Sequence, residues 1–243
     1  METLNLISFI FLVVLFVLAP RGALRSARLL RQMAANGQAL PRTRVALSTM
    51  FSLAVVWTLS VINATALGRN LFNTAGMGPR EIGLGVVAFV VLLGAMPIAR
   101  AIQTPEEERH RLVHTLAPRN GREFALFVAI AVMAGIAEES AYRGVAVWIL
   151  APVMGNVGAM FLAAMAFAVA HAVQGGKHMM LIFAIAALFH ALVYFTGTLV
   201  IAMVVHTAYD IVAGHEAAKR ARQIPGDDLG QAPAVNVAPP PTG

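Results

Sequence analysis

One apolar run of the chain is long enough to cross a bilayer and yet contains three ionisable side chains. The run extends from Phe124 to Leu150 and includes Glu138, Glu139 and Arg143. Crossing a hydrocarbon core of about 30 Å takes about 20 residues. An ionised side chain at the centre of a membrane helix costs about 2.5–3.5 kcal/mol on insertion scales. Such side chains persist only where they pair, face a wet cavity or do chemistry, so the run indicates an enzyme of the membrane interior.

The composition sets the fold class. Across 243 residues the mean hydropathy is +0.73 and only 12% of the residues are charged, about half the share of an ordinary soluble domain. We therefore expect an all-α fold, a polytopic transmembrane helical bundle. Cysteine is absent, which excludes disulfides, a thiol nucleophile and a cysteine metal site. The net charge of +6 does not indicate nucleic-acid binding, because no basic stripe with interleaved aromatic residues is present.

The hydropathy pattern predicts about seven membrane spans. The apolar runs fall at about residues 4–19, 45–67, 82–99, 124–150, 157–173, 179–196 and 198–213. The first run follows no positive charge, so we interpret it as an uncleaved helix rather than a signal peptide. The number would change by one if the last two runs do not form a hairpin.

Arginine is distributed unevenly among the connecting loops. Loops 20–44 and 100–123 are rich in arginine, whereas 68–81 has two arginines and 151–156 has none. Short loops rich in Lys and Arg stay in the cytoplasm and contact anionic lipid. This distribution predicts an N-terminus outside and a C-terminus inside the cell. The end of the chain, rich in Pro, Gly, Ala and Asp, predicts a disordered cytoplasmic tail over 216–243.

Helical spacing gives the two adjacent glutamates different partners. Glu139 and Arg143 are four residues apart and share a helical face, so they can form an ion pair. Glu138 is rotated by about 100° around the axis and has no built-in partner. Small residues around the pair, including Gly135 and Gly144, would let a neighbouring helix approach closely.

Two later runs add polar residues at sites where polarity is costly. The fifth run ends at His171, and the seventh contains His206 and Asp210 at i, i+4 spacing. A carboxylate so placed can fix the tautomer and orientation of a histidine. Each residue alone would fit a polar core position, but together with Glu138 they predict one convergent cluster. His190, in the sixth run, has no spaced partner, and we interpret it as a packing or hydrogen-bonding residue.

The residues are compatible with peptide hydrolysis. That reaction needs a base for water, a donor for the leaving amine and stabilisation of an oxyanion. A buried carboxylate near a histidine can supply the first two. The lack of cysteine, and of a serine in a nucleophile elbow, disfavours an acyl-enzyme.

Three motifs, taken in order, resemble those of a known family. They read Glu138-Glu139-Ser-Ala-Tyr-Arg143, Phe167-Ala-Val-Ala-His171 and His206-Thr-Ala-Tyr-Asp210. The pattern resembles the CAAX prenyl endopeptidase and bacteriocin-processing family, called CPBP or Abi proteins. The resemblance covers about residues 122–213. It suggests three parts: N-terminal membrane helices and cytoplasmic loops over 1–121, a CPBP-type core over 122–215 and the tail.

The resemblance implies an intramembrane endopeptidase of the CAAX-protease type, a hydrolase whose site opens toward the cytoplasm. Its substrate would be a membrane-associated protein or peptide, and the chain would be integral to the bilayer, in the bacterial inner membrane. Carried over by position, Glu138 and His171 would activate the attacking water, and Glu139 with Arg143 would hold the helix geometry.

The same resemblance assigns His206 and Asp210 to the oxyanion. The family often has Asn where this chain has Asp210, and an ionised Asp cannot donate a hydrogen bond. Asp210 would then orient His206 or be protonated. The family is often described as metalloproteases, and Glu138, His171 and His206 could bind zinc. No His-Glu-x-x-His motif is present, so we favour metal-free, glutamate-activated water, with no cofactor.

Two other classes of function remain open at this point. A non-catalytic membrane protein, such as a bacteriocin-immunity-like binding protein, could keep the same residues as a polar core. A proton-coupled transporter could use them as a relay. Transporters usually show two similar halves with broken helices, a pattern that this sequence lacks.

Overall fold

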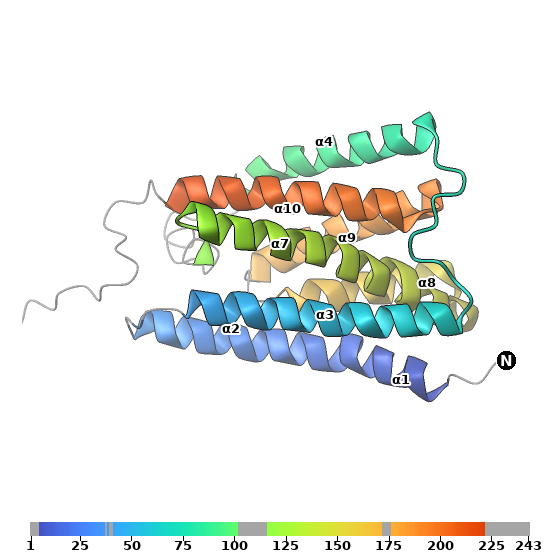
Figure 1. Ribbon diagram of the computed structural model, residues 1–243, viewed down its shortest axis with the longest axis horizontal. Helices are drawn as coiled ribbons and strands as arrows, with labels where there is room; N and C mark the ends of the chain where they lie inside the picture. Colours follow the sequence, from blue (N-terminus) through green and yellow to red (C-terminus); the bar gives the residue numbers. More distant parts are fainter. Residues whose placement is uncertain (1–4, 37, 39–40, 102–115, 172–175, 222–243) are drawn as a thin grey trace, which may run out of the picture.

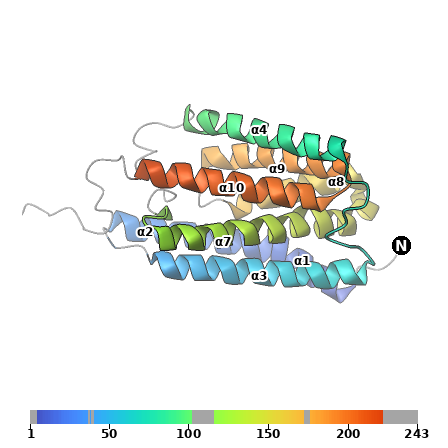
Figure 2. The ribbon, with the colours of Figure 1, turned by 45° about the horizontal axis from the view of Figure 1, so that its top comes forward.

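The described residues fold into a bundle of long helices lying roughly along one axis (Figures 1 and 2). The structure is a computed structural model that describes residues 5–36, 38, 41–101, 116–171 and 176–221. Within these ranges there are helices and turns but no strand. The predicted all-α transmembrane bundle is confirmed.

The helices follow the apolar runs of the sequence. In chain order they are α1 (Leu6–Val13), the π-helical turn η1 (Val14–Leu18), α2 (Ala19–Ala35), α3 (Arg42–Ala66), α4 (Pro79–Ala101), α7 (Gly121–Glu138), the π-helical segment η2 (Glu139–Val145), α8 (Ala146–Ala170), α9 (Gly176–Thr196) and α10 (Leu199–Ala221). The first three segments are continuous, so the first predicted span extends well beyond residue 19.

Five helical stretches of the described chain are long and apolar enough to cross a membrane. They are Leu6–Met33, Arg42–Ala66, Pro79–Ala99, Gly121–Ala170 and Lys177–Thr196. The fourth stretch has 50 residues and breaks at Gly155, whose φ of 75° and ψ of 163° are not helical. It therefore joins two of the predicted runs. α10 is not among the five, since it carries polar residues such as His206 and Asp210, and the count of seven spans stays a prediction.

The last helix moves one predicted boundary. α10 continues to Ala221, so residues 216–221, which we expected in the tail, are helical. The predicted tail from 222 to 243 lies outside the described residues.

The start of α7 is fixed by polar contacts. The Asn120 side chain accepts a hydrogen bond from the Glu123 backbone N–H at 2.9 Å, and the Glu123 carboxylate accepts one from the Asn120 amide at 3.3 Å, a reciprocal arrangement like that of a capping box. Arg42, at the start of α3, forms an ion pair with Glu123 at 3.1 Å and donates to the Ala117 carbonyl at 3.0 Å. These contacts hold the starts of α3 and α7 together.

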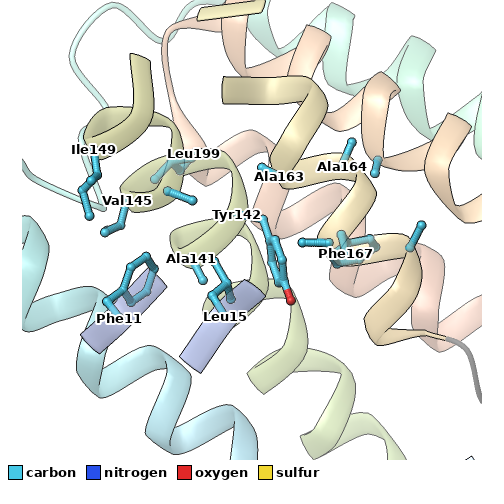
Figure 3. Close-up of a cluster of buried hydrophobic side chains, with 14 of the residues drawn as sticks. Phe11, Leu15, Ala141, Tyr142, Val145, Ile149, Ala163, Ala164, Phe167 and Leu199 are labelled. Atoms are coloured by element: carbon cyan, nitrogen blue, oxygen red, sulfur yellow. The ribbon is translucent and has the colours of Figure 1, made fainter. Parts of the chain in front are cut away.

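The main core surrounds η2. Phe11 and Leu15 of the first helix are buried against the segment that contains Ala141 and Val145 (Figure 3). The ring of Tyr142 meets that of Phe167 edge-on at 5.0 Å. The first helix and α8 therefore pack against η2 from two sides, and this packing fixes the positions of its polar residues.

Candidate active site

The candidate site begins where α7 changes into a π-helix. Glu138 is the last residue of α7 and Glu139 is the first of η2, whose seven residues are all buried. π-Helical turns inside α-helices are rare overall, and those that occur are often found at functional sites. Because the backbone widens here, two adjacent carboxylates can approach one partner from different sides.

Glu139 and Arg143 form the ion pair that their spacing suggested. The guanidinium Nη1 lies 3.1 Å from Glu139 Oε1, and both side chains are fully buried. The contact is a charge contact rather than an aligned hydrogen bond. The guanidinium carbon also lies over two rings, 4.4 Å from the centre of Phe167 and 5.2 Å from that of Phe189. Cation–π attraction from both rings adds to the stabilisation of this buried cation.

His206 is bracketed by the two glutamates. Its Nδ1 lies 2.7 Å from Glu139 Oε1, a buried hydrogen bond, while its Nε2 lies 3.7 Å from Glu138 Oε2. Since an ionised carboxylate only accepts hydrogen bonds, the imidazole donates from Nδ1. Glu139 therefore fixes the ring of His206, the role that sequence spacing suggested for Asp210.

Asp210 lies on the other side of the same imidazole. Its Oδ2 is 3.5 Å from His206 Nε2, and its side chain is 31% exposed. It thus faces the same nitrogen as Glu138 and belongs to the open part of the cluster.

His171 completes the cluster at the end of α8. Its Nδ1 lies 2.8 Å from the Phe167 carbonyl oxygen, to which it donates. In the neutral form this leaves Nε2 without a proton, and Nε2 lies 4.0 Å from Glu138 Oε2. That separation is too long for a direct hydrogen bond and fits one bridging water.

Exposure divides the cluster into two halves. The side chains of Glu139, Arg143 and His206 are 0%, 0% and 8% exposed, whereas Glu138 is 17% and His171 is 26% exposed. The closed half holds the geometry, and the open half is accessible to water. The three helices that supply these residues are thus brought together, as the sequence predicted, and the catalytic roles remain to be tested.

The donor atoms of the cluster are the kinds that could bind a metal, and their spacing is described by the contacts between them. Among the described residues, no group of three or more His, Cys, Asp or Glu side chains has the spacing of a metal site. Glu138 Oε2 is 3.7 and 4.0 Å from the two histidine nitrogens, and one of these nitrogens also faces Asp210. Metal-free catalysis stays a prediction.

Two features of the site were not found from the sequence. The hydrogen bond from His206 to Glu139 joins residues 67 positions apart, so no local spacing could indicate it. Phe189 lies against both Arg143 and His206, with ring centres 5.3 Å apart in the second case. A single phenylalanine within an apolar run does not indicate that its ring will pack against these two polar side chains. His190, beside it, is buried, and its Nε2 has no hydrogen-bond partner within the described residues.

The part of the chain that contains this cluster matches a family model. Residues 120–212 match the Rce1-like family, described as type II CAAX prenyl endopeptidase Rce1-like. This segment is similar to the Rce1-like family. The family predicted from the three motifs is confirmed, and it implies intramembrane protease activity of the CAAX type. No curated protein and no solved structure matches the chain. The match covers less than half of the chain, and all six clustered residues lie inside it.

Proposed function

We propose that the protein is an intramembrane endopeptidase in which Glu138 and His171 activate water at a site near the cytoplasmic membrane face. The observation that carries the proposal is the separation of 4.0 Å between Glu138 Oε2 and His171 Nε2. Both groups are partly exposed and can hold one water between two acceptors. General-base catalysis requires this reach, directly or through one water.

The proposed reaction moves one proton through Glu138. The carboxylate takes a proton from water as the hydroxide oxygen attacks the peptide carbonyl carbon. A tetrahedral oxyanion forms. When it collapses, the C–N bond breaks and the proton passes to the leaving amine. One water is consumed and two peptide fragments leave.

His206 is the proposed donor to the oxyanion. To donate from Nε2 while Nδ1 donates to Glu139, the imidazole must carry both protons. The carboxylates of Glu139, Glu138 and Asp210 lie 2.7, 3.7 and 3.5 Å from its nitrogens and supply balancing negative charge. In this scheme Asp210 stabilises the charged ring and does not contact the oxyanion as a donor. The ion pair of Glu139 with Arg143 holds that ring in place.

Substitution of the two water-binding residues tests the proposal. We expect Glu138→Gln and His171→Ala to abolish cleavage of a membrane peptide substrate, while both variants remain folded in the membrane. The measurement is single-turnover cleavage by the purified protein, with thermal unfolding as the check on folding. Cleavage at the normal rate by Glu138→Gln would refute the proposal and favour a non-catalytic binding protein that keeps the cluster as a polar core.

Chelation tests the metal-free part separately. Ligands and metal form one unit in a metalloprotease, so a zinc enzyme loses activity to a strong chelator and regains it with added metal. We expect full activity after exhaustive chelation. Loss that is reversed by zinc would instead assign Glu138, His171 and His206 as ligands.

A further inference from the structure

A polar cavity lies beyond the end of η2 that is farther from the catalytic cluster. It has a volume of about 560 Å³ and is lined by the turn after α3, by Trp148 of α8 and by the junction of α9 and α10. Trp148 is ten positions beyond Glu138, about 15 Å along a helix. The cavity is therefore distinct from the site described above.

The walls of this cavity are fixed by backbone and side-chain contacts. Gly68, two residues after the end of α3, has a left-handed φ of 62°, and the next N–H, that of Arg69, donates to the Ala64 carbonyl at 2.8 Å. Gly197, directly after α9, has a φ of 69°, and its N–H donates to the Val193 carbonyl at 2.9 Å. Residues that have a side chain rarely adopt this backbone conformation, whereas glycine adopts it without steric cost.

One hydrogen bond joins the two walls. The Thr198 hydroxyl donates to the Asn73 carbonyl at 2.7 Å across 125 residues of sequence. Leu71, between the polar residues of the turn, is only 5% exposed and belongs to the main core. The cavity is thus preformed, which lowers the entropic cost of binding.

The polar groups of the cavity are donors. Arg69 lies over the ring of Trp148, 5.9 Å from its centre, and no ion pair links it to a carboxylate within the described residues. Asn70 Oδ1 accepts from the Phe72 N–H at 2.9 Å, and Asn73 Oδ1 accepts from the Ala75 N–H at 3.1 Å. With both amide oxygens occupied, the amide N–H groups remain to bind a ligand.

The composition of the lining selects the ligand. A guanidinium and two amide N–H₂ groups with no carboxylate among the lining residues fit an anion with several oxygen acceptors. Trp148, Val193 and Leu199 make the rest of the wall apolar. Tyr194, which is exposed nearby, is the type of residue that gathers at the headgroup level of a membrane.

We propose that this cavity binds a phosphate monoanion, presented by an anionic phospholipid or free in solution. Arg69 and the amides of Asn70 and Asn73 bind the phosphate oxygens, and the apolar wall accommodates the first carbons of the acyl chains of a lipid.

Fluorescence of Trp148 reports on binding directly. The chain has two tryptophans, and Trp57→Phe leaves Trp148 as the single reporter. Phosphatidylglycerol brominated near the glycerol is titrated into the full-length protein in detergent. We expect saturable quenching, with a half-saturating concentration about tenfold or more higher in Arg69→Gln, since a charged hydrogen-bond donor is lost.

Two further variants make the test specific. Asn70→Asp keeps the acceptor for the Phe72 N–H and replaces the free amide by a negative charge, so we expect a weakening similar to that of Arg69→Gln without loss of fold. Arg80→Gln is the matched control, because Arg80 is 68% exposed and pairs with Glu81 outside the cavity. We expect its half-saturating concentration to change less than twofold.

Competition against the brominated lipid shows whether the bound phosphate is free or part of a lipid. If millimolar inorganic phosphate restores the fluorescence, the anion alone suffices; if only unbrominated phosphatidylglycerol restores it, the site requires a lipid. Either result supports the proposal. Quenching that does not saturate, that is equal in Arg69→Gln and Arg80→Gln, or that is as strong with brominated phosphatidylcholine would overturn it.

Discussion

At the scale of single residues, the two adjacent glutamates have separate tasks. Glu139 is fully buried and contacts both Arg143 and His206, whereas Glu138 is partly exposed and faces the two histidines. Helical spacing alone predicts the pairing with Arg143, because it depends only on positions within one helix. Spacing cannot predict that Glu139 also holds His206, since that contact depends on how α7 and α10 pack.

These separate tasks predict that substitutions in the buried pair, and not at Glu138, lower the stability of the protein. We expect Glu139→Ala to lower the free energy of unfolding by about 3–5 kcal/mol, because it leaves the guanidinium of Arg143 buried without a counter-charge. Arg143→Ala should cost less, because the charged ring of His206 stays beside Glu139. The measurement is reversible denaturation of the protein in mixed micelles.

Surface and catalytic variants provide the comparison for that prediction. Arg80→Ala breaks an exposed ion pair and should change stability little, while Glu138→Gln should change activity without a comparable change in stability. Equal stability losses in Glu138→Gln and Glu139→Ala would contradict the separate roles.

The donor role of His206 gives a third outcome at this scale. We expect His206→Ala to lower the turnover rate by about 10²–10³-fold, the usual cost of removing one oxyanion donor. Activity should fall less than in Glu138→Gln, because water activation remains. A loss as complete as that of Glu138→Gln, in a variant that stays folded, would assign His206 to water activation as well.

At the scale of the elements, the site depends on close packing between α7 and α10. Gly135 lies against Thr207 and Met203, so that a Cβ at Gly135 would meet the Thr207 hydroxyl and come within 2.8 Å of the Met203 carbonyl oxygen. This contact is one turn from the glutamates and one residue from His206. Small residues around the glutamates indicated a close helix approach, but not which helix approaches. The π-helical turn was not predictable, since no residue pattern in 139–145 differs from that of an α-helix.

A larger side chain at Gly135 should separate the two helices. We expect Gly135→Val to destabilise the protein by about 1–3 kcal/mol through overpacking and to lower cleavage further, because Glu139 and His206 move apart. Thermal unfolding and single-turnover cleavage are the measurements. Gly94→Ala is the control, since a Cβ at Gly94 meets nothing within 4 Å; a similar loss in both variants would contradict the role of the close approach.

At the scale of the whole molecule, the distribution of charge and the arrangement of the helices give one topology. The start of α1 and the end of α10 lie at opposite ends of the bundle (Figure 1). The turn between α3 and α4 lies at the same end as the start of α1 and is poor in arginine, whereas the arginine-rich α2 ends at the other end of the bundle. By the positive-inside rule we expect the second end to face the cytoplasm.

This topology predicts the side on which fused reporters are active. A phosphatase fused before Met1 or inserted at Gly76, in the turn after α3, should be active, because we expect both positions to face the outside. A fluorescent protein fused after Gly243 should fold and fluoresce in the cytoplasm. The same experiment tells on which side of the membrane each end of the bundle lies, and so from which side a substrate reaches Glu138 and His171, which lie 4.0 Å apart. An active phosphatase at the C-terminus, with an inactive one at Gly76, would reverse the orientation and place the opening of the site on the outer face.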